Sequence, residues 1–294
     1  MTLKIAILIP VYNGLNYLKN SLPLIHQQIN RIEKFKFHIV VIDDNSNDGT
    51  DIWLKTNYPD ILVLHGDGSL WWSGGINMGV RHVLADQDYD FVLLWNHDTV
   101  CAGNYFSILA EVANKYHAKS MIASKIFFLA EPETIFNMGA FFNPKTGKIS
   151  LNGYGRKDSD EFSQPVEVDW TGGMGTLIPV EVFQQIGLFD QQNFPQYYGD
   201  SDFFLRAKAF GFKLIAIPEL KIWNDKSSSG LEHKNKWSLF FRSLSSTKSN
   251  RNIVIEYKFL RRHCNSLFFL FFFILRILKY FVSFFKQWFL SLFK

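Results

Sequence analysis

Acidic and amide side chains are concentrated in residues 43–50, which read DDNSNDGT. So many polar groups in one turn cost free energy unless they contact a polar ligand or cap a helix. A helix cap would use Ser46 or Asp48 and would leave the other polar groups unexplained. The run therefore predicts a ligand site that includes Asp43 and Asp44.

A second polar group, Asn96-His97-Asp98, follows the apolar run FVLLW at residues 91–95. Mg²⁺ and Mn²⁺ prefer oxygen ligands, often one or two carboxylates together with substrate phosphates. A carboxylate at the exit of a buried strand can hold such an ion against a diphosphate, where the ion neutralises charge on the leaving group. Asp98 is the candidate metal ligand, and the alternative is a solvated residue that caps the next helix.

Residues 71–79, WWSGGINMG, combine aromatic side chains with a glycine-rich turn. Glycines at a helix N-terminus let the backbone approach a phosphate, which makes the turn around Gly75 and Asn77 a candidate phosphate contact. Trp71 and Trp72 could line a sugar pocket, and packing in the core or in a lid is the alternative.

Two further runs, DWTGGMG at residues 169–175 and YYGDSD at residues 197–202, combine glycines with carboxylates. Glycine permits close approach of a sugar ring, and a carboxylate beside the sugar can take a proton from an acceptor hydroxyl. Asp200 and Asp202 both fall in the first turn of an expected helix, where the helix dipole favours carboxylates in any case. Arg206 can pair with Asp202 on one helical face.

The elements that must position these groups alternate along the first half of the chain. Strands are expected at residues 5–9, 38–42, 61–64 and 91–95, and helices at residues 15–29, 50–57, 75–85 and 104–116. This alternation predicts a doubly wound parallel sheet. Ligands bind such sheets beyond the carboxyl ends of the strands, which is where Asn13, Asp43 and Asp98 fall.

The composition is that of a globular protein. The chain has 294 residues, of which 47% are hydrophobic and 20% charged, and this suits one catalytic domain with an appendage. The net charge of +4 comes from scattered basic residues, which argues against nucleic acid as a partner. The first apolar run breaks at Pro10 and is interpreted as a strand rather than a signal peptide. Cys101 and Cys264 match no metal or redox spacing and are expected to be free thiols.

The C-terminal residues 251–294 are basic and rich in phenylalanine. Arg276, Lys279 and Lys286 fall on one side of a helix, which is typical of an amphipathic helix that lies in a membrane interface against anionic headgroups. The alternatives are a core helix, a dimer interface and a spanning helix, which the central charges disfavour. A polar linker is expected at residues 226–250.

The order of these motifs resembles the glycosyltransferases of family 2, and in particular the rhamnosyltransferase-like branch that builds bacterial surface polysaccharides such as O-antigen or capsule. The resemblance covers about residues 4–225. The similar runs are Pro10-Val11-Tyr12-Asn13-Gly14, residues 43–50 and 75–79, Asn96-His97-Asp98, residues 168–173, Gly187-Leu188-Phe189-Asp190, Asp200-Ser201-Asp202 and Leu205-Arg206-Ala207.

The resemblance implies an α/β protein with a GT-A fold at residues 1–225, and the pattern of residues 251–294 adds C-terminal amphipathic helices. A Rossmann-like nucleotide-sugar half, residues 1–119, would be fused to a smaller mixed acceptor half, residues 120–225. It implies inverting transfer from dTDP-rhamnose or a UDP-sugar, with Mg²⁺ or Mn²⁺ as cofactor. The acceptor would be a lipid-linked glycan at the cytoplasmic face of the inner cell membrane, where the enzyme would be peripheral. A homodimer is compatible with this interpretation.

The resemblance also implies roles for single residues. Asp98 and Asn96 would hold the metal, and Asp200 would be the general base, with Asp202 sharing or taking that role. Trp170, Gly172 and Gly173 would contact the acceptor. The donor nucleotide would contact Pro10, Tyr12, Asn13, Asp43, Asp44, Gly75 and Asn77.

Two positions depart from the pattern of the family. Gly199 stands where relatives carry the Glu of a Glu-Asp pair. Residues 222–225, IWND, stand where relatives often carry a His that contacts the metal or the diphosphate, and His233 is a candidate replacement. These departures leave an inactive glycan-binding scaffold as one alternative. The other is a nucleotidyltransferase, although the basic phosphate-binding loop expected for that class is missing before Lys19.

Overall fold

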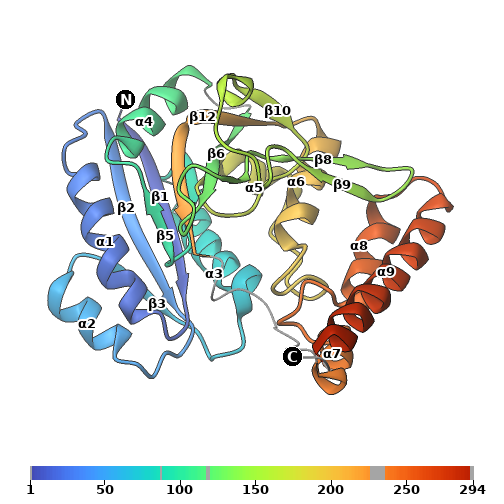
Figure 1. Cartoon of the computed structure of the whole chain (residues 1–294). Helices are drawn as coiled ribbons and strands as arrows, with labels where there is room; N and C mark the ends of the chain where they lie inside the picture. The colour runs from blue at the N-terminus through green and yellow to red at the C-terminus, as the bar shows by residue number, and fades with distance from the viewer. Residues whose placement is uncertain (1, 87, 117–119, 226–235, 292–294) are drawn as a thin grey trace.

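The computed structural model describes residues 2–86, 88–116, 120–225 and 236–291, and within them a ten-stranded mixed sheet forms the centre of the molecule. The strand order is β10-β12-β6-β11-β4-β1-β2-β3, with β5 paired to β12 and β7 paired to β6. Helices cover both faces of the sheet, and α7, α8 and α9 form an arm beside it (Figure 1). This is the predicted α/β architecture.

The first half of the chain folds as the predicted parallel unit. β1 (Leu3–Val11) pairs in parallel with β2 (Phe35–Asp43) and β4 (Phe91–Leu94), and β2 pairs in parallel with β3 (Leu62–His65). Alternate residues of β1 point into two separate cores, one on each face of the sheet. The helices of this half are α1 (Leu15–Ile29), α2 (Thr50–Asn57), α3 (Trp71–Asp86) and α4 (Tyr105–Lys115).

The second half adds antiparallel pairing to the same sheet. β11 (Thr176–Pro179) lies antiparallel between β4 and β6 (Ser120–Phe128), and β12 (Lys213–Asn224) runs parallel to β6. Because β11 joins β4 to β6, the two halves share one continuous sheet. The remaining elements are β5 (Thr99–Cys101), β7 (Ile135–Asn137), β8 (Ala140–Asn143), β9 (Lys148–Leu151), a 3₁₀ turn at Asp160–Phe162, β10 (Val166–Val168), α5 (Val180–Ile186) and α6 (Gly199–Phe210).

The C-terminal arm consists of α7 (Trp237–Ser243), α8 (Ile253–His263) and α9 (Phe268–Ser291). Part of the expected polar linker is therefore helical, because α7 buries Phe240 against Phe284 of α9. Residues 226–235, including the candidate His233, lie outside the described residues. In the described part of the chain, α9 is the one helix long and apolar enough to cross a membrane by length and composition alone.

Candidate functional site

The loops that follow β1 and β2 are joined to each other by hydrogen bonds. The backbone N–H of Asn13 donates to Ser46 Oγ at 2.9 Å, and the N–H of Asn47 donates to Asn13 Oδ1 at 2.8 Å. Asn13 adopts a left-handed conformation with φ 51°, which asparagine tolerates better than most residues. Tyr12 beside it is 57% exposed and is therefore accessible to a ligand.

Asp43 and Asp44 are buried and shape the loops around them. Asp43 Oδ1 accepts the N–H of Ser46 at 2.9 Å. Asp44 accepts the N–H of Gly68 at 2.8 Å on one carboxylate oxygen and that of Leu70 at 3.0 Å on the other. The structure therefore gives both residues a role in ordering the nucleotide-side loops, and direct contact with a nucleotide stays a prediction.

Gly75 and Asn77 do not line the site as expected. Both are buried inside α3, which begins at Trp71 rather than Gly75, and a Cβ on Gly75 would lie 3.1 Å from Pro10 Cβ. The side chain of Asn77 donates to the carbonyl of Phe189 at 2.9 Å and accepts the N–H of the same residue at 3.0 Å. Asn77 thus has its hydrogen-bonding groups engaged by protein and holds the loop before α6 against α3.

Trp72 lies at the centre of the candidate site and joins three segments. Its indole Nε1 donates to Asn96 Oδ1 at 2.9 Å, and its backbone N–H donates to Gln196 Oε1 at 3.2 Å. Gly173 packs so closely on the ring that a Cβ there would come within 2.1 Å of it. The sequence is compatible with two roles for Trp72, lining a sugar pocket or packing in the core or a lid. The structure shows a packing role, because Trp72 connects the segments around Asn96, Gly173 and Gln196.

The contact with Trp72 changes the role expected for Asn96. The amide oxygen that would bind a metal accepts the indole N–H instead. Asn96 therefore positions Trp72 and is a poor metal ligand in this arrangement.

Asp98 has the environment expected of a cation ligand. Its Oδ1 atom is buried and has no hydrogen-bond partner among the residues that the structure describes. Burial raises the pKa of Asp98, nearby His97 opposes this shift, and the negative charge of Asp225 adds to it. A buried carboxylate that lies near a second negative charge is destabilised unless a cation is bound.

Asp225 follows β12 directly and was noted from the sequence only as part of a departure from the family pattern. Tyr17 donates to its Oδ2 at 3.3 Å, which fixes the carboxylate near the β1–α1 loop. Within the described ranges, no three His, Cys, Asp or Glu side chains form a group that could hold a metal ion. Two carboxylates still fit Mg²⁺ or Mn²⁺, since these ions take their remaining ligands from water and substrate phosphates.

Asp200 combines partial burial with hydrogen bonds to the backbone. Burial raises the pKa of Asp200 to about 6, although the N–H groups of Ser201 and Gly173 favour the carboxylate form. The Ser201 N–H lies 2.7 Å from Asp200 Oδ1. A carboxylate with a pKa near neutrality can accept a proton and release it again, which is the property of a general base.

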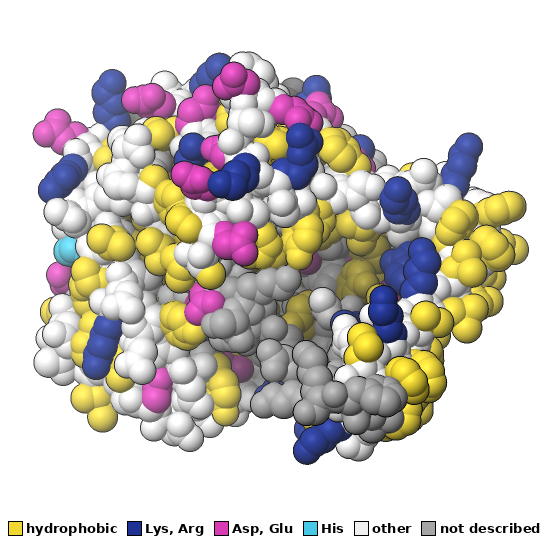
Figure 2. Space-filling model, viewed as in Figure 1, with side chains coloured by type: hydrophobic (Ala, Val, Ile, Leu, Met, Phe, Trp, Pro, Cys, Tyr) yellow, Lys and Arg dark blue, Asp and Glu magenta, His cyan; other side chains and the backbone are white. Residues whose placement is uncertain are grey.

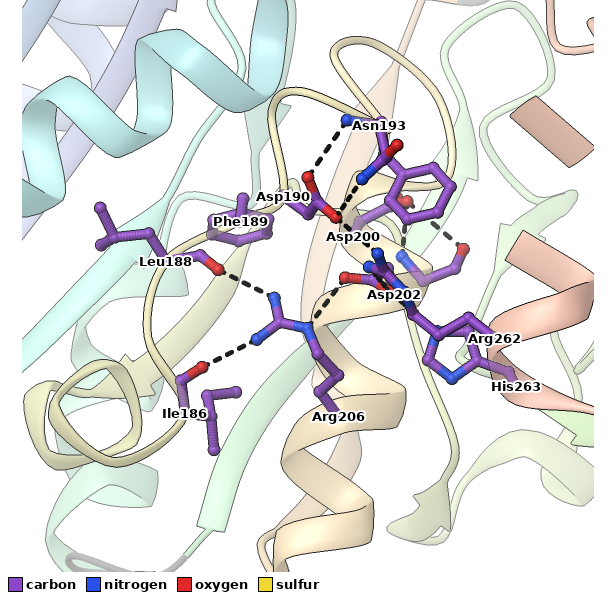
Figure 3. A network of polar contacts seen from close by, with 12 residues as sticks. Ile186, Leu188, Phe189, Asp190, Asn193, Asp200, Asp202, Arg206, Arg262 and His263 are labelled. Carbon is purple, nitrogen blue, oxygen red and sulfur yellow. Dashed lines mark hydrogen bonds and ion pairs between the residues drawn. The ribbon is translucent and has the colours of Figure 1, made fainter. Parts of the chain in front are cut away.

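Both carboxylate oxygens of Asp202 are bonded to other side chains, which argues against the expected share of Asp202 in the base role. It is fully buried, and Figure 3 shows its carboxylate between Arg206, Arg262 and His263. Oδ2 accepts from Arg206 Nε at 2.9 Å, while Oδ1 accepts from Arg262 Nη1 at 2.9 Å and lies 2.8 Å from His263 Nε2. The first of these pairs was predicted from the i, i+4 spacing, whereas the two contacts with α8 were not.

Gly199 is explained by the close approach of α3. A Cβ at this position would lie 2.3 Å from Ser73 Oγ and 2.9 Å from the carbonyl oxygen of Phe194. Ser73 Oγ itself donates to that carbonyl at 2.6 Å. The Glu carried by relatives would not fit here without displacing α3, which leaves the neighbouring Asp200 as the candidate base.

The expected acceptor residues lie on the loop between β10 and β11. Trp170 pairs through its backbone with Ala140, and its indole Nε1 is buried with no partner among the described residues. A Cβ on Gly172 would make only ordinary contacts, the nearest at 3.9 Å, whereas Gly173 packs on Trp72. Gly173 is therefore part of the contact between the two halves, and Trp170 and Gly172 remain candidates for acceptor binding.

Known proteins with similar sequences are glycosyltransferases. The family model described as glycosyl transferase family 2 matches residues 6–170. An uncharacterized glycosyltransferase of Rickettsia typhi is 23% identical over 253 residues, covering 82% of this chain and 72% of that protein. A galactofuranosyltransferase, GlfT2 of Mycolicibacterium smegmatis, is 23% identical over 201 residues, covering 62% of this chain and only 30% of that protein.

Solved structures with the same fold include two glycosyltransferases. S. aureus TarS 1–349 in complex with UDP-GlcNAc superposes with a TM-score of 0.55 at 16% identity, covering 89% of this chain and 72% of that chain. GalNAc-T7 with UDP, GalNAc and Mn²⁺ superposes with a TM-score of 0.60 at 15% identity, covering 92% and 56%. The predicted GT-A fold is confirmed by these likenesses. With more than half of its length matched by the family model, the chain belongs to glycosyl transferase family 2 and is a glycosyltransferase.

Proposed function

We propose that the chain transfers a sugar from a nucleotide diphosphate to a hydroxyl of a glycan acceptor, with inversion at the anomeric carbon. One observation carries this proposal. Trp72 contacts both Asn96, two residues before Asp98, and Gly173, whose backbone favours the carboxylate form of Asp200. The candidate metal ligand and the candidate base therefore border one site.

Asp200 is the proposed base of a direct displacement. The acceptor oxygen forms a bond to the anomeric carbon while the bond from that carbon to the diphosphate oxygen breaks, and the hydroxyl proton passes to Asp200. With a pKa of about 6, Asp200 is mainly ionised at neutral pH and ready to accept this proton. Attack on the face opposite the leaving group inverts the anomeric configuration.

Asp98 and Asp225 would hold the divalent cation together with the donor diphosphate. When bound, Mg²⁺ or Mn²⁺ supplies positive charge that stabilises the departing diphosphate. The unpartnered oxygen of Asp98 and the neighbouring charge of Asp225 support this assignment. The Mn²⁺ and UDP bound to GalNAc-T7 are consistent with it.

The donor is proposed to be a UDP-sugar, with dTDP-rhamnose as the second candidate. UDP-GlcNAc bound to TarS supports the first, and the motif pattern of the rhamnosyltransferase-like branch supports the second. The acceptor is proposed to be a lipid-linked glycan of a surface polysaccharide at the cytoplasmic face of the membrane. The family match favours glycosyl transfer over the nucleotidyltransferase alternative.

A thermal-shift screen of UDP-, dTDP- and GDP-sugars, each with Mn²⁺ and with EDTA, tests the donor assignment. A rise in Tm with UDP- or dTDP-sugars that EDTA removes would support a metal-assisted donor site. Release of free sugar from the same donor would show that the site is catalytic. The absence of both a shift and hydrolysis would favour the inactive scaffold.

A further inference from the structure

Helix α9 carries a continuous apolar face that is left open in the described part of the molecule. Its members are 47–69% exposed and recur at intervals of three or four residues, which places them on one side of a helix. Figure 2 shows hydrophobic side chains gathered along the outer edge of the C-terminal arm. The open face consists of Phe271, Ile274, Leu278, Val282, Phe285 and Phe289.

The opposite face of α9 packs against the protein near both ends of the helix. Near the start of α9, buried Phe269 contacts Tyr257 of α8, with ring centroids 6.3 Å apart. Near its end, buried Phe284 stacks on Phe240 of α7 at 4.3 Å. Because both ends are packed on neighbouring helices, α9 lies flat on α7 and α8.

An ion pair in the middle of α9 adds to this attachment. Arg276 Nη1 lies 2.7 Å from Oε1 of Glu256, a fully buried residue of α8. If α9 crossed a bilayer in this packing, the ion pair and the exposed Lys258 and Arg261 of α8 would enter the hydrocarbon with it. Burying those charges is costly, so the structure disfavours a spanning orientation.

Charge distinguishes a lipid surface from a second copy of the chain as the partner of this face. Lys279 and Lys286 are exposed and seven residues apart, which aligns them along one edge of the apolar face. α9 contains no acidic residue. Two copies packed face to face would find no carboxylate on α9 for these lysines, whereas anionic headgroups complement them.

We propose that this face of α9 lies in the interface of an anionic lipid bilayer, with the helix parallel to the membrane plane. The C-terminal arm is hydrogen-bonded to α6, the helix that carries Asp200, and to the loop before it. Arg262 of α8 donates to Asp202 of α6, and Lys258 of α8 donates to Asn193 of that loop. This attachment holds Asp200 at a fixed height above the lipid. The consequence for a lipid-linked acceptor rests on the proposed function, whereas the membrane contact itself does not.

Flotation of the full chain with vesicles tests the membrane contact. We expect the protein to float with phosphatidylcholine vesicles that contain about 30% phosphatidylglycerol and to float much less with pure phosphatidylcholine. Leu278→Asp/Val282→Asp and Lys279→Glu/Lys286→Glu should each reduce the floated fraction at least about tenfold. The matched controls, Ile52→Asp, whose side chain is 71% exposed on α2, and Lys34→Glu/Lys115→Glu, should float like the wild type.

Three results would overturn the proposal. These are failure of the wild type to float, flotation of the α9 variants at the wild-type level, and wild-type protein that resists extraction from vesicles by alkaline carbonate, as a spanning helix would. Circular dichroism and donor-induced thermal shifts show whether each variant is folded. Flotation without sugar transfer would support the membrane contact and contradict the proposed function. Sugar transfer to a soluble acceptor without flotation would contradict the membrane contact and support the proposed function.

Discussion

Arg262 Nη1 donates to Asp202 Oδ1 at 2.9 Å and thereby joins two helices whose contacting residues are 60 positions apart. The same guanidinium lies 2.8 Å from Asp190 Oδ2 in the loop before α6. Figure 3 shows both carboxylates beside Arg262. Helix α8 is therefore bonded to the segment that presents Asp200, and the C-terminal arm and the catalytic half form one polar network.

Replacing Asp202 by Asn should destabilise the protein more than it slows the chemistry. The substitution removes the buried negative charge that pairs with Arg206 and Arg262, although Arg262 keeps its contact with Asp190. We expect a loss of about 2 kcal/mol in the free energy of unfolding. Urea denaturation measures this loss, and Glu181→Gln, at an exposed position of α5, is the control. The kcat of the folded variant should fall less than about tenfold. Normal stability with no turnover would instead assign the base to Asp202.

Replacing Asp98 by Asn should stabilise the metal-free protein but remove metal-dependent donor binding. The Asp98 carboxylate is buried beside Asp225 with a raised pKa, so its charged form destabilises the folded protein at neutral pH. Asn has nearly the same shape without the charge and should raise stability of the metal-free protein by about 1 kcal/mol. Calorimetric titration with donor and Mn²⁺ should show that metal-dependent binding is lost. Full activity of this variant would refute the metal assignment.

The pH dependence of kcat/KM should follow the ionisation of Asp200. A general base acts only when deprotonated, so the rate should fall as the pH drops below about 6 and level off above it. One pH unit below the pKa, about a tenth of the base is ionised, and kcat/KM should be about tenfold lower. A profile that is flat between pH 5 and 8 would exclude Asp200 as the titrating group.

Replacing Gly199 by Ala should force α3 and α6 apart. The added methyl group would lie 2.3 Å from Ser73 Oγ, and we expect a loss of stability of about 2 kcal/mol. Combining it with Ser73→Gly removes that contact, so the double variant should be more stable than the sum of the single effects predicts. Strictly additive free energies in this double-mutant cycle would show that the contact does not explain Gly199.

Local patterns were enough to predict the helices and the parallel strands of the first half. α1 and α2 have the predicted limits, because their apolar periodicity and boundary residues lie within the helices themselves. α3 begins earlier than predicted since Ser73 donates its N–H to Pro195 O, a partner more than a hundred residues away. α7 was missed because its buried face, which includes Phe240, is covered by α9.

The sequence was enough to identify the candidate carboxylates, but it did not identify the residues that contact them. Asp98 and Asp200 follow recognisable motifs, and the structure gives them the environments of a cation ligand and a base. Asn77 and Asp202 belong to equally prominent motifs, but their partners at residues 189 and 262 are distant in the sequence. Motif membership therefore identified the candidate residues, and only tertiary contacts showed which of them are held by other parts of the protein.

The assignment of Asp200 as the general base is tested most directly by measuring the kinetics of the Asp200→Asn variant with the donor found by the thermal-shift screen. Asn cannot accept the acceptor proton but preserves the size of the side chain and its contact with Ser201. We predict that kcat falls by at least about a thousandfold while the Kd for donor and Mn²⁺ stays within about threefold. A variant that keeps more than about a tenth of the wild-type kcat would contradict the assignment of Asp200 as the general base.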